Sequence, residues 1–162
     1  MKKLLLPIML LTPISASAMG IHISPEVKAG IMLGSGIQLG VTDVWGLEAV
    51  YGSYHYMSET NSVYDHSSKA YRMGVQKMFG QNKRFGFQAE IGYAEYEGTR
   101  DSWSETKHRT AESVSIGGAY VYQATDSIGL RAGMDINLYG IGNAYFAYGA
   151  QPSFSLGAIF HF

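Results

Sequence analysis

Strict alternation of apolar and polar residues is the feature that most constrains the fold of this chain. Over residues 154–162, every second position carries an apolar side chain: Phe154, Leu156, Ala158, Phe160 and Phe162. A period of two is that of a β-strand, whose successive side chains point to opposite faces. Phe162 is in phase with the apolar face, and we expect it to lie at a lipid–water boundary, where aromatic side chains anchor barrel strands.

The same alternation recurs through most of the chain and is clearest over residues 128–139, where Ile, Leu, Ala and Met alternate with Gly, Arg, Asp and Asn. Polar or Gly-rich segments separate the alternating runs. The expected strands are 21–33, 37–41, 47–57, 69–79, 85–97, 113–123, 128–139 and 154–162. These are about eight strands, and most are near the ~9–11 residues that cross a bilayer as a tilted strand.

Residues 21–41 allow two interpretations, because one apolar parity continues from Ile21 to Val41. A three-residue turn at 34–36 would split the segment into a hairpin and keep Ile37 on the face of Leu33. A single long strand over 21–41 is the alternative. The hairpin is favoured because both ends of an outer-membrane barrel lie in the periplasm, which requires an even number of strands.

The polar parity is rich in Gly, Ser, Ala and Gln, whereas a solvated face usually carries a dense coat of Lys and Glu. Small residues suit the interior of an eight-stranded barrel, which side chains fill. The sequence thus predicts an all-β fold: an eight-stranded antiparallel up-and-down transmembrane β-barrel, with short periplasmic turns and longer external loops. A soluble calycin-type barrel is the alternative. The expected aromatic girdles comprise Phe79, Phe85, Tyr93, Tyr120, Tyr122, Phe160 and Phe162.

The N-terminal segment has the three parts of a secretory signal peptide. These are a basic start with Lys2 and Lys3, a short apolar run over 4–11 and a small-residue cleavage site at 16–18. We expect cleavage after Ala18, leaving one mature domain, 19–162, in the outer membrane of a Gram-negative cell. Loss of Lys2 and Lys3 would lower the formal charge from −1 to −3, which argues against a nucleic-acid partner.

No cofactor and no metal site is expected. The chain has no cysteine, and its five histidines are scattered without the spacing of metal ligands. The glycine-rich segments lie within expected strands rather than between a strand and a helix, which is the wrong context for a phosphate-binding loop.

The sequence resembles the small outer-membrane barrels of the OmpA-transmembrane, opacity and adhesion/invasion type. The resemblance is carried by the signal peptide, by residues 36–43 leading into 47–51, and by the last strand. It implies a non-enzymatic, structural or surface-interaction role, such as envelope integrity, adhesion or resistance to host factors. The last strand also resembles the C-terminal signal read by the barrel-assembly machinery, which would comprise Ser155, Gly157, Phe160 and Phe162.

The external loops are expected at 58–68, 98–110 and 140–152 and would meet any host or surface ligand. The barrel itself would contact outer-membrane lipid. The basic run Lys107-His108-Arg109 could contact lipopolysaccharide phosphates, because clustered cations favour anionic head groups.

Charged residues gather on the parity expected to face the barrel interior. Because an unpaired buried charge is costly, these groups should pair with one another and form a plug that fills the barrel. A narrow small-solute channel is the alternative. The predicted interior network comprises Glu26, Lys28, Glu48, Arg72, Glu90, Arg131, Asp135 and His161.

A second constellation is expected on the outward parity. Ser53 and His55 are two residues apart and so share a face, and Glu95 has the outward parity on a later strand. This loosely resembles the lipid-facing Ser, His and Glu of outer-membrane lipid A deacylases, although the His-x-Ser order is reversed here. An outer-membrane lipid A-modifying hydrolase is therefore the alternative function.

Overall fold

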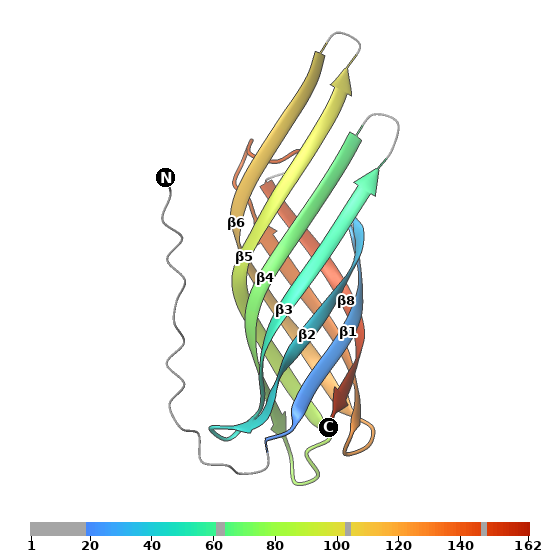
Figure 1. Ribbon diagram of the computed structural model, residues 1–162, viewed down its shortest axis with the longest axis vertical. Helices are drawn as coiled ribbons and strands as arrows, with labels where there is room; N and C mark the ends of the chain where they lie inside the picture. Colours follow the sequence, from blue (N-terminus) through green and yellow to red (C-terminus); the bar gives the residue numbers. More distant parts are fainter. Residues whose placement is uncertain (1–18, 61–63, 103–104, 147–148) are drawn as a thin grey trace.

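The computed structural model describes residues 19–60, 64–102, 105–146 and 149–162, so the predicted signal peptide at 1–18 lies outside the described residues. Eight strands form one closed barrel (Figure 1). Among the described residues, no helix is long and apolar enough to cross a membrane. The strands are β1 (Ile21–Gly30), β2 (Leu33–Val44), β3 (Leu47–Thr60), β4 (Tyr64–Phe79), β5 (Phe85–Ser102), β6 (Glu105–Gln123), β7 (Ile128–Leu138) and β8 (Ala150–His161).

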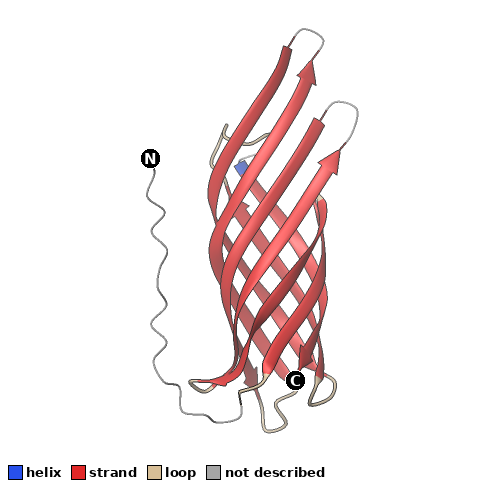
Figure 2. Ribbon diagram, viewed as in Figure 1, coloured by secondary structure: helices blue, strands red, loops and turns tan. Residues whose placement is uncertain are grey.

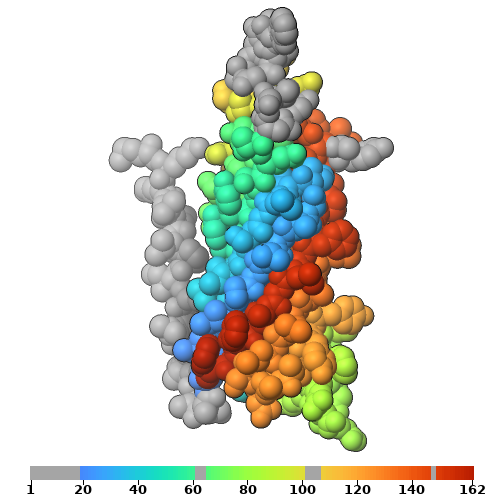
Figure 3. Space-filling model, turned by 90° about the vertical axis from the view of Figure 1, so that its right-hand side faces the viewer, coloured from blue at the N-terminus to red at the C-terminus, as the bar shows by residue number. Residues whose placement is uncertain are grey.

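Every strand pairs antiparallel with its neighbours in the chain, and β1 closes the barrel against β8. At this seam Val27 lies opposite Leu156 and His22 lies opposite His161. Figure 3 shows the first and last strands side by side, with blue β1 against red β8. The predicted eight-stranded antiparallel up-and-down barrel is confirmed.

The two faces of the sheet are reversed relative to a soluble barrel. On β2 the Gln38 side chain is fully buried, whereas its neighbour Leu39 is 54% exposed. The same inversion holds on β7, where Asp135 is buried and Met134 is 59% exposed. An apolar exterior around a polar interior suits a barrel surrounded by hydrocarbon, since a closed sheet pairs all its backbone groups internally.

The first hairpin forms, so the split of residues 21–41 is confirmed, but the predicted turn at 34–36 is wrong. The chain turns at Ile31–Met32, and Gly34 lies inside β2 opposite Lys28. Glycine is needed at 34 for another reason: a Cβ there would collide with the carbonyl oxygen of Tyr56 on β3. This glycine permits close strand packing rather than a turn.

The expected loops at 58–68 and 98–110 are also wrong, because most of these residues belong to strands. Continuous cross-strand pairing carries β3 and β4 to Thr60–Asp65, and it carries β5 and β6 to Ser102–Glu105. The expected loop at 140–152 is shorter, since β8 begins at Ala150. These strand ends lack an apolar period, so alternation could not reveal them. Figure 2 shows β3–β6 extending above the other strands.

Two glycines test how tightly the interior is packed. A Cβ on inward-facing Gly74 would meet the Tyr51 ring within 2.5 Å, whereas the nearest atom to a Cβ on Gly52 is 3.9 Å away. We expect Gly74→Val to destabilise the barrel by about 1–3 kcal/mol through overpacking. Gly52→Val, in open space, should change stability by less than about 0.5 kcal/mol. Urea unfolding in detergent micelles measures both, and equal effects would contradict the packing described here.

Candidate functional site

The centre of the barrel holds a compact network of buried charged side chains. It contains three carboxylates and three cations, each at most 7% exposed. Inward parity on four different strands brings them to one level of the lumen. The network comprises Glu26, Lys28, Arg72, Glu90, Arg131 and Asp135.

Each carboxylate in this network contacts more than one cation. Asp135 lies 2.7 Å from Nη2 of Arg72 and also binds Lys28. Glu90 lies 3.4 Å from Arg72 and 3.5 Å from Arg131. Glu26 contacts Arg131 directly and lies 3.6 Å from Lys28. The positive and negative charges therefore balance within the lumen, which reduces the cost of burying each of them.

Neutral side chains complete the network, and sequence reasoning missed most of them. Nε of Arg72 donates to Ser115 Oγ at 2.5 Å, and the Tyr51 hydroxyl donates to Glu90 at 3.1 Å. Toward the periplasmic end, Gln38 and Gln88 exchange hydrogen bonds and Gln88 also donates to Gln76. Inward parity was the available signal for these residues, but parity does not show which strands bring them into contact.

Two of the predicted interior residues lie apart from this network. Glu48 lies at the rim of the barrel next to the short turns, with its side chain 27% exposed and 3.9 Å from Nζ of the exposed Lys83. His161 lies at the closing seam, where its Nε2 is 3.0 Å from Nδ1 of His22. Both residues lie at the rim because their strands end there. The predicted interior placement of Glu48 is wrong, because Glu48 shares the outward parity of Tyr54 and Tyr56 on β3.

The predicted assembly-signal residues divide between the two faces of β8. Ser155 is buried, and a Cβ on Gly157 would lie 3.0 Å from the Cβ of Glu26 inside the barrel. Phe162 is 75% exposed and lies at one end of the seam between β1 and β8, whereas Gly30 lies at the other end. Phe160 is half-buried. Recognition of these residues by an assembly machinery stays a prediction.

The outward placement predicted for Ser53 and His55 is wrong. Both side chains are buried in the lumen, because Tyr54 and Tyr56 occupy the outward parity of β3. Nδ1 of His55 lies 2.8 Å from Glu26 and 2.8 Å from Nζ of Lys28. The weak alternation in this strand allowed either parity, and the pairing with β2 and β4 decides it.

Glu95 does face outward on β5, so it cannot meet the buried Ser53 and His55. The Ser53 hydroxyl instead donates to Glu90 at 3.3 Å, within the charged network. The three residues of the supposed lipid-facing constellation therefore lie on opposite sides of the barrel wall.

An apolar cap lies above the network at the external end of the lumen. The loop after β7 contributes Tyr139, Ala144 and Phe146, which pack against Tyr96 of β5. Nδ1 of His66 lies 2.8 Å from the Tyr96 hydroxyl. Burial lowers the pKa of His66 and raises the pKa of Tyr96 to about 12, so both are neutral at pH 7.

The loop that forms this cap is fastened to β6. Nη1 of Arg109 donates to the carbonyl oxygen of Gly142 at 2.9 Å, and the Arg109 guanidinium lies 4.4 Å from the Tyr145 ring centroid. The Tyr145 hydroxyl donates to the carbonyl oxygen of Lys107 at 3.2 Å. Arg109 is thus engaged by the protein, and a contact of its basic run with lipopolysaccharide stays a prediction.

Beside the cap loop, β6 presents an edge on which the described residues place no neighbouring strand. Its pairing with β5 continues to Glu105, but its pairing with β7 begins only at Val114 opposite Leu138. Within the part of the chain that the structure describes, residues 106–112 of β6 therefore pair with a strand on one side alone. Unpaired edges of this kind offer backbone hydrogen-bonding groups to other chains.

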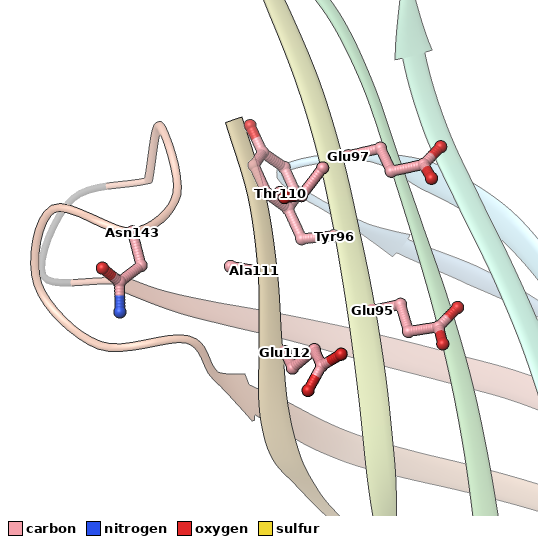
Figure 4. A pocket seen from close by; sticks show the side chains of 7 residues that line it. All are labelled: Glu95, Tyr96, Glu97, Thr110, Ala111, Glu112 and Asn143. Atoms are coloured by element: carbon pink, nitrogen blue, oxygen red, sulfur yellow. The ribbon is translucent and has the colours of Figure 1, made fainter. Parts of the chain in front are cut away.

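A surface pocket of about 590 Å³ lies beside this edge (Figure 4). Its walls carry three carboxylates from β5 and β6, whereas Asn143 reaches it from the cap loop. The described residues contain no group of three or more potential ligands arranged to hold a metal ion. The carboxylates are those of Glu95, Glu97 and Glu112.

The charged network can be tested by removing one cation. We expect Arg131→Ala to destabilise the barrel by about 3–5 kcal/mol, because Glu26 and Glu90 each lose a buried partner. The matched control is Lys83→Ala, which breaks the exposed pair with Glu48 and should cost only ~0–1 kcal/mol. Urea unfolding in detergent micelles measures both, and an Arg131→Ala barrel as stable as the control would show that the network contributes little.

Several solved structures share this barrel architecture. No protein-family model and no curated protein sequence matches the chain. The N-terminal β-barrel domain of Pseudomonas aeruginosa OprF matches with a TM-score of 0.60 and 16% identity, over 88% of this chain and 97% of that one.

Two further structures match over a similar length. The attachment invasion locus protein Ail of Yersinia pestis has a TM-score of 0.58 and 14% identity, over 89% of this chain and 96% of its own. A major outer membrane protein of Thermus thermophilus has a TM-score of 0.65 and 10% identity, over 90% and 100%. At these identities the likeness concerns the fold, and this chain has the fold of the small eight-stranded outer-membrane β-barrels.

Proposed function

We propose that this protein is a non-enzymatic barrel of the outer membrane that displays a four-stranded sheet for contact with other surfaces. The observation that carries the proposal is the continuation of β3–β6 beyond the apolar cap, with an unpaired edge on β6. A barrel that served only to cross the membrane would need no strand residues beyond the external girdle.

One backbone hydrogen bond identifies which residues of β6 direct their backbone N–H and C=O groups toward the open edge. The N–H of Gln123 donates to the carbonyl of Arg84 at 2.8 Å, so Gln123 faces the β5 side. The register between β5 and β6 is uninterrupted from Phe85–Tyr122 to Ser102–Glu105. Alternation of antiparallel hydrogen bonding then directs the backbone groups of His108, Thr110 and Glu112 away from β5. These groups can pair with an added strand.

The filled lumen supports the absence of a transport role. The charged network occupies the middle of the barrel, and the apolar cap lies over its external end. Aqueous channels occur in much larger barrels. The interior network is therefore proposed to act as a plug that fills and stabilises the barrel.

The absence of catalysis is likewise a proposal, supported by the site geometry. Ser53 and His55 face the lumen and Glu95 faces outward, so these three residues do not form a Ser–His–Glu set that faces lipid. His55 contacts one anion, Glu26, and one cation, Lys28, and so belongs to the buried network. It is not placed as a general base beside a substrate.

The proposed route to the outer membrane begins with cleavage of residues 1–18 and continues with assembly through β8. Lipopolysaccharide would then surround the external girdle, where Tyr54, Tyr71 and Tyr93 lie side by side on β3, β4 and β5. Tyrosine is typical of such lipid–water boundaries.

The plug predicts a closed pore. Purified wild-type protein reconstituted in planar bilayers should show conductance near zero, and Arg131→Ala should leave it there, because neighbouring charged side chains still occupy the lumen. A large, stable conductance from the wild-type barrel would contradict the plug and favour the channel.

The surface role predicts adherence that depends on the β6 edge. Bacteria producing the protein in their outer membrane should adhere to cultured epithelial monolayers. Thr110→Pro removes one edge N–H without breaking the β5 ladder and should reduce adherence by about fivefold, the value of one backbone hydrogen bond of ~1 kcal/mol. Counting adherent cells against a strain without the protein gives the measurement.

The matched control is Thr110→Ala, which removes the side chain and keeps the N–H, and it should adhere like the wild type. Replacing residues 59–65 and 98–109 by short turns should abolish adherence while the barrel still forms, as checked by heat-modifiable gel mobility. Undiminished adherence after this replacement would contradict the proposed display function.

A further inference from the structure

The outward face of β5–β8 contains an apolar groove of about 540 Å³. Its floor includes Gly118 and Ala132, which face outward where neighbouring positions carry long side chains. The groove is part of the exposed apolar belt that the membrane would cover, and it is hollowed rather than flush. Its walls are formed by Phe87, Tyr120, Met134, Phe154 and Leu156.

The absence of a side chain at Gly118 is not imposed by packing. A Cβ at this position would have ordinary room, since the nearest atom is the Gln88 carbonyl oxygen at 3.6 Å. By contrast, a Cβ on the inward-facing Gly133 would meet Ala119 at 2.8 Å. Glycine in a strand interior often marks a position where another molecule approaches closely. The hollow above Gly118 is therefore space that the protein leaves for an external group.

The walls of the groove are aromatic on one side and flexible on the other. The rings of Phe87 and Tyr120 lie with their centroids 4.1 Å apart, so one wall is a packed aromatic pair. The opposite wall includes Met134, 59% exposed, and Leu156, 63% exposed. A long, apolar and flexible group fits between such walls, because it gains dispersion contacts along its whole length.

The aromatic wall of the groove lies toward the periplasmic end of the barrel, whereas Phe154 lies nearer the other end, opposite Ala29 in β1. Phe87 and Tyr120 are opposite one another, one outward residue above the pair of Phe85 and Tyr122. That lower pair stands next to the short turn after β4 and the turn before β7, at the end of the barrel opposite the projecting sheet. An acyl chain that packs along this aromatic wall would thus belong to a lipid of the periplasmic leaflet, which is phospholipid.

We propose that this groove is a binding site for one acyl chain of a phospholipid from the periplasmic leaflet, held more tightly than the lipid around it. The occupant follows from continuity with the exposed apolar belt, from the apolar side chains that line the groove and from the position of its aromatic wall. The site requires the barrel to lie in a membrane, but it is independent of the proposed surface-contact role on β6.

The test is native mass spectrometry of the protein extracted from outer membranes in mild non-ionic detergent. The wild type should retain one phospholipid per barrel, identified by its mass. Gly118→Phe and Ala132→Phe would fill the groove and should lower the lipid-bound fraction by about tenfold, because the acyl chain loses its apolar contacts. Ala132→Leu should cause a smaller loss, and heat-modifiable mobility checks that each variant folds.

The matched control is Gly52→Phe, which adds the same side chain to an outward glycine outside the groove and should retain the lipid. A wild type without bound phospholipid, or equal retention by the groove variants and the control, would overturn the site. A retained mass equal to lipid A would overturn the periplasmic source. A dimer that Gly118→Phe disrupts would assign the groove to a second copy instead.

Discussion

Pairing of all backbone hydrogen-bonding groups within one closed sheet is the constraint on which this structure depends. Hydrocarbon offers no partners for an open edge, so β1 must meet β8 where the barrel crosses the membrane. Closure also determines where an edge can remain: only above the external girdle, where β6 extends beyond β7 and water can hydrate its backbone. The same requirement therefore accounts for both the closed wall of the barrel and the open edge of β6.

Closure with eight strands produces a narrow interior, and the chemistry of the lumen follows from that dimension. A bulky side chain fits where a neighbouring strand carries glycine, as the Tyr51 ring fits over Gly74. Charges placed in so small a space cannot remain apart, and Arg72 consequently bridges Glu90 and Asp135 from different strands. This filled and charge-balanced lumen is the basis for proposing a plug in place of a channel.

Sequence patterns predicted the strands correctly where one face meets hydrocarbon, because the apolar period is then strong, as it is from Ile128 to Leu138. They failed where that contrast disappears. The polar ends of β5 and β6 looked like a loop, and Gly34 looked like a turn although it serves close packing against Tyr56. In β3 the weak period allowed Ser53 and His55 to be placed on the wrong face, and a one-residue error in parity inverts a whole strand.

The sequence by itself determined the β-barrel class, the even strand count and the inward charges of β1, β4, β5 and β7, because alternation and parity are local properties of the chain. Only the tertiary structure decided which charges meet, that Glu48 lies at the rim beside Lys83, and that β6 keeps an unpaired edge. Those outcomes depend on register and strand tilt, which bring together residues far apart in the chain, and a single strand carries no record of its neighbours.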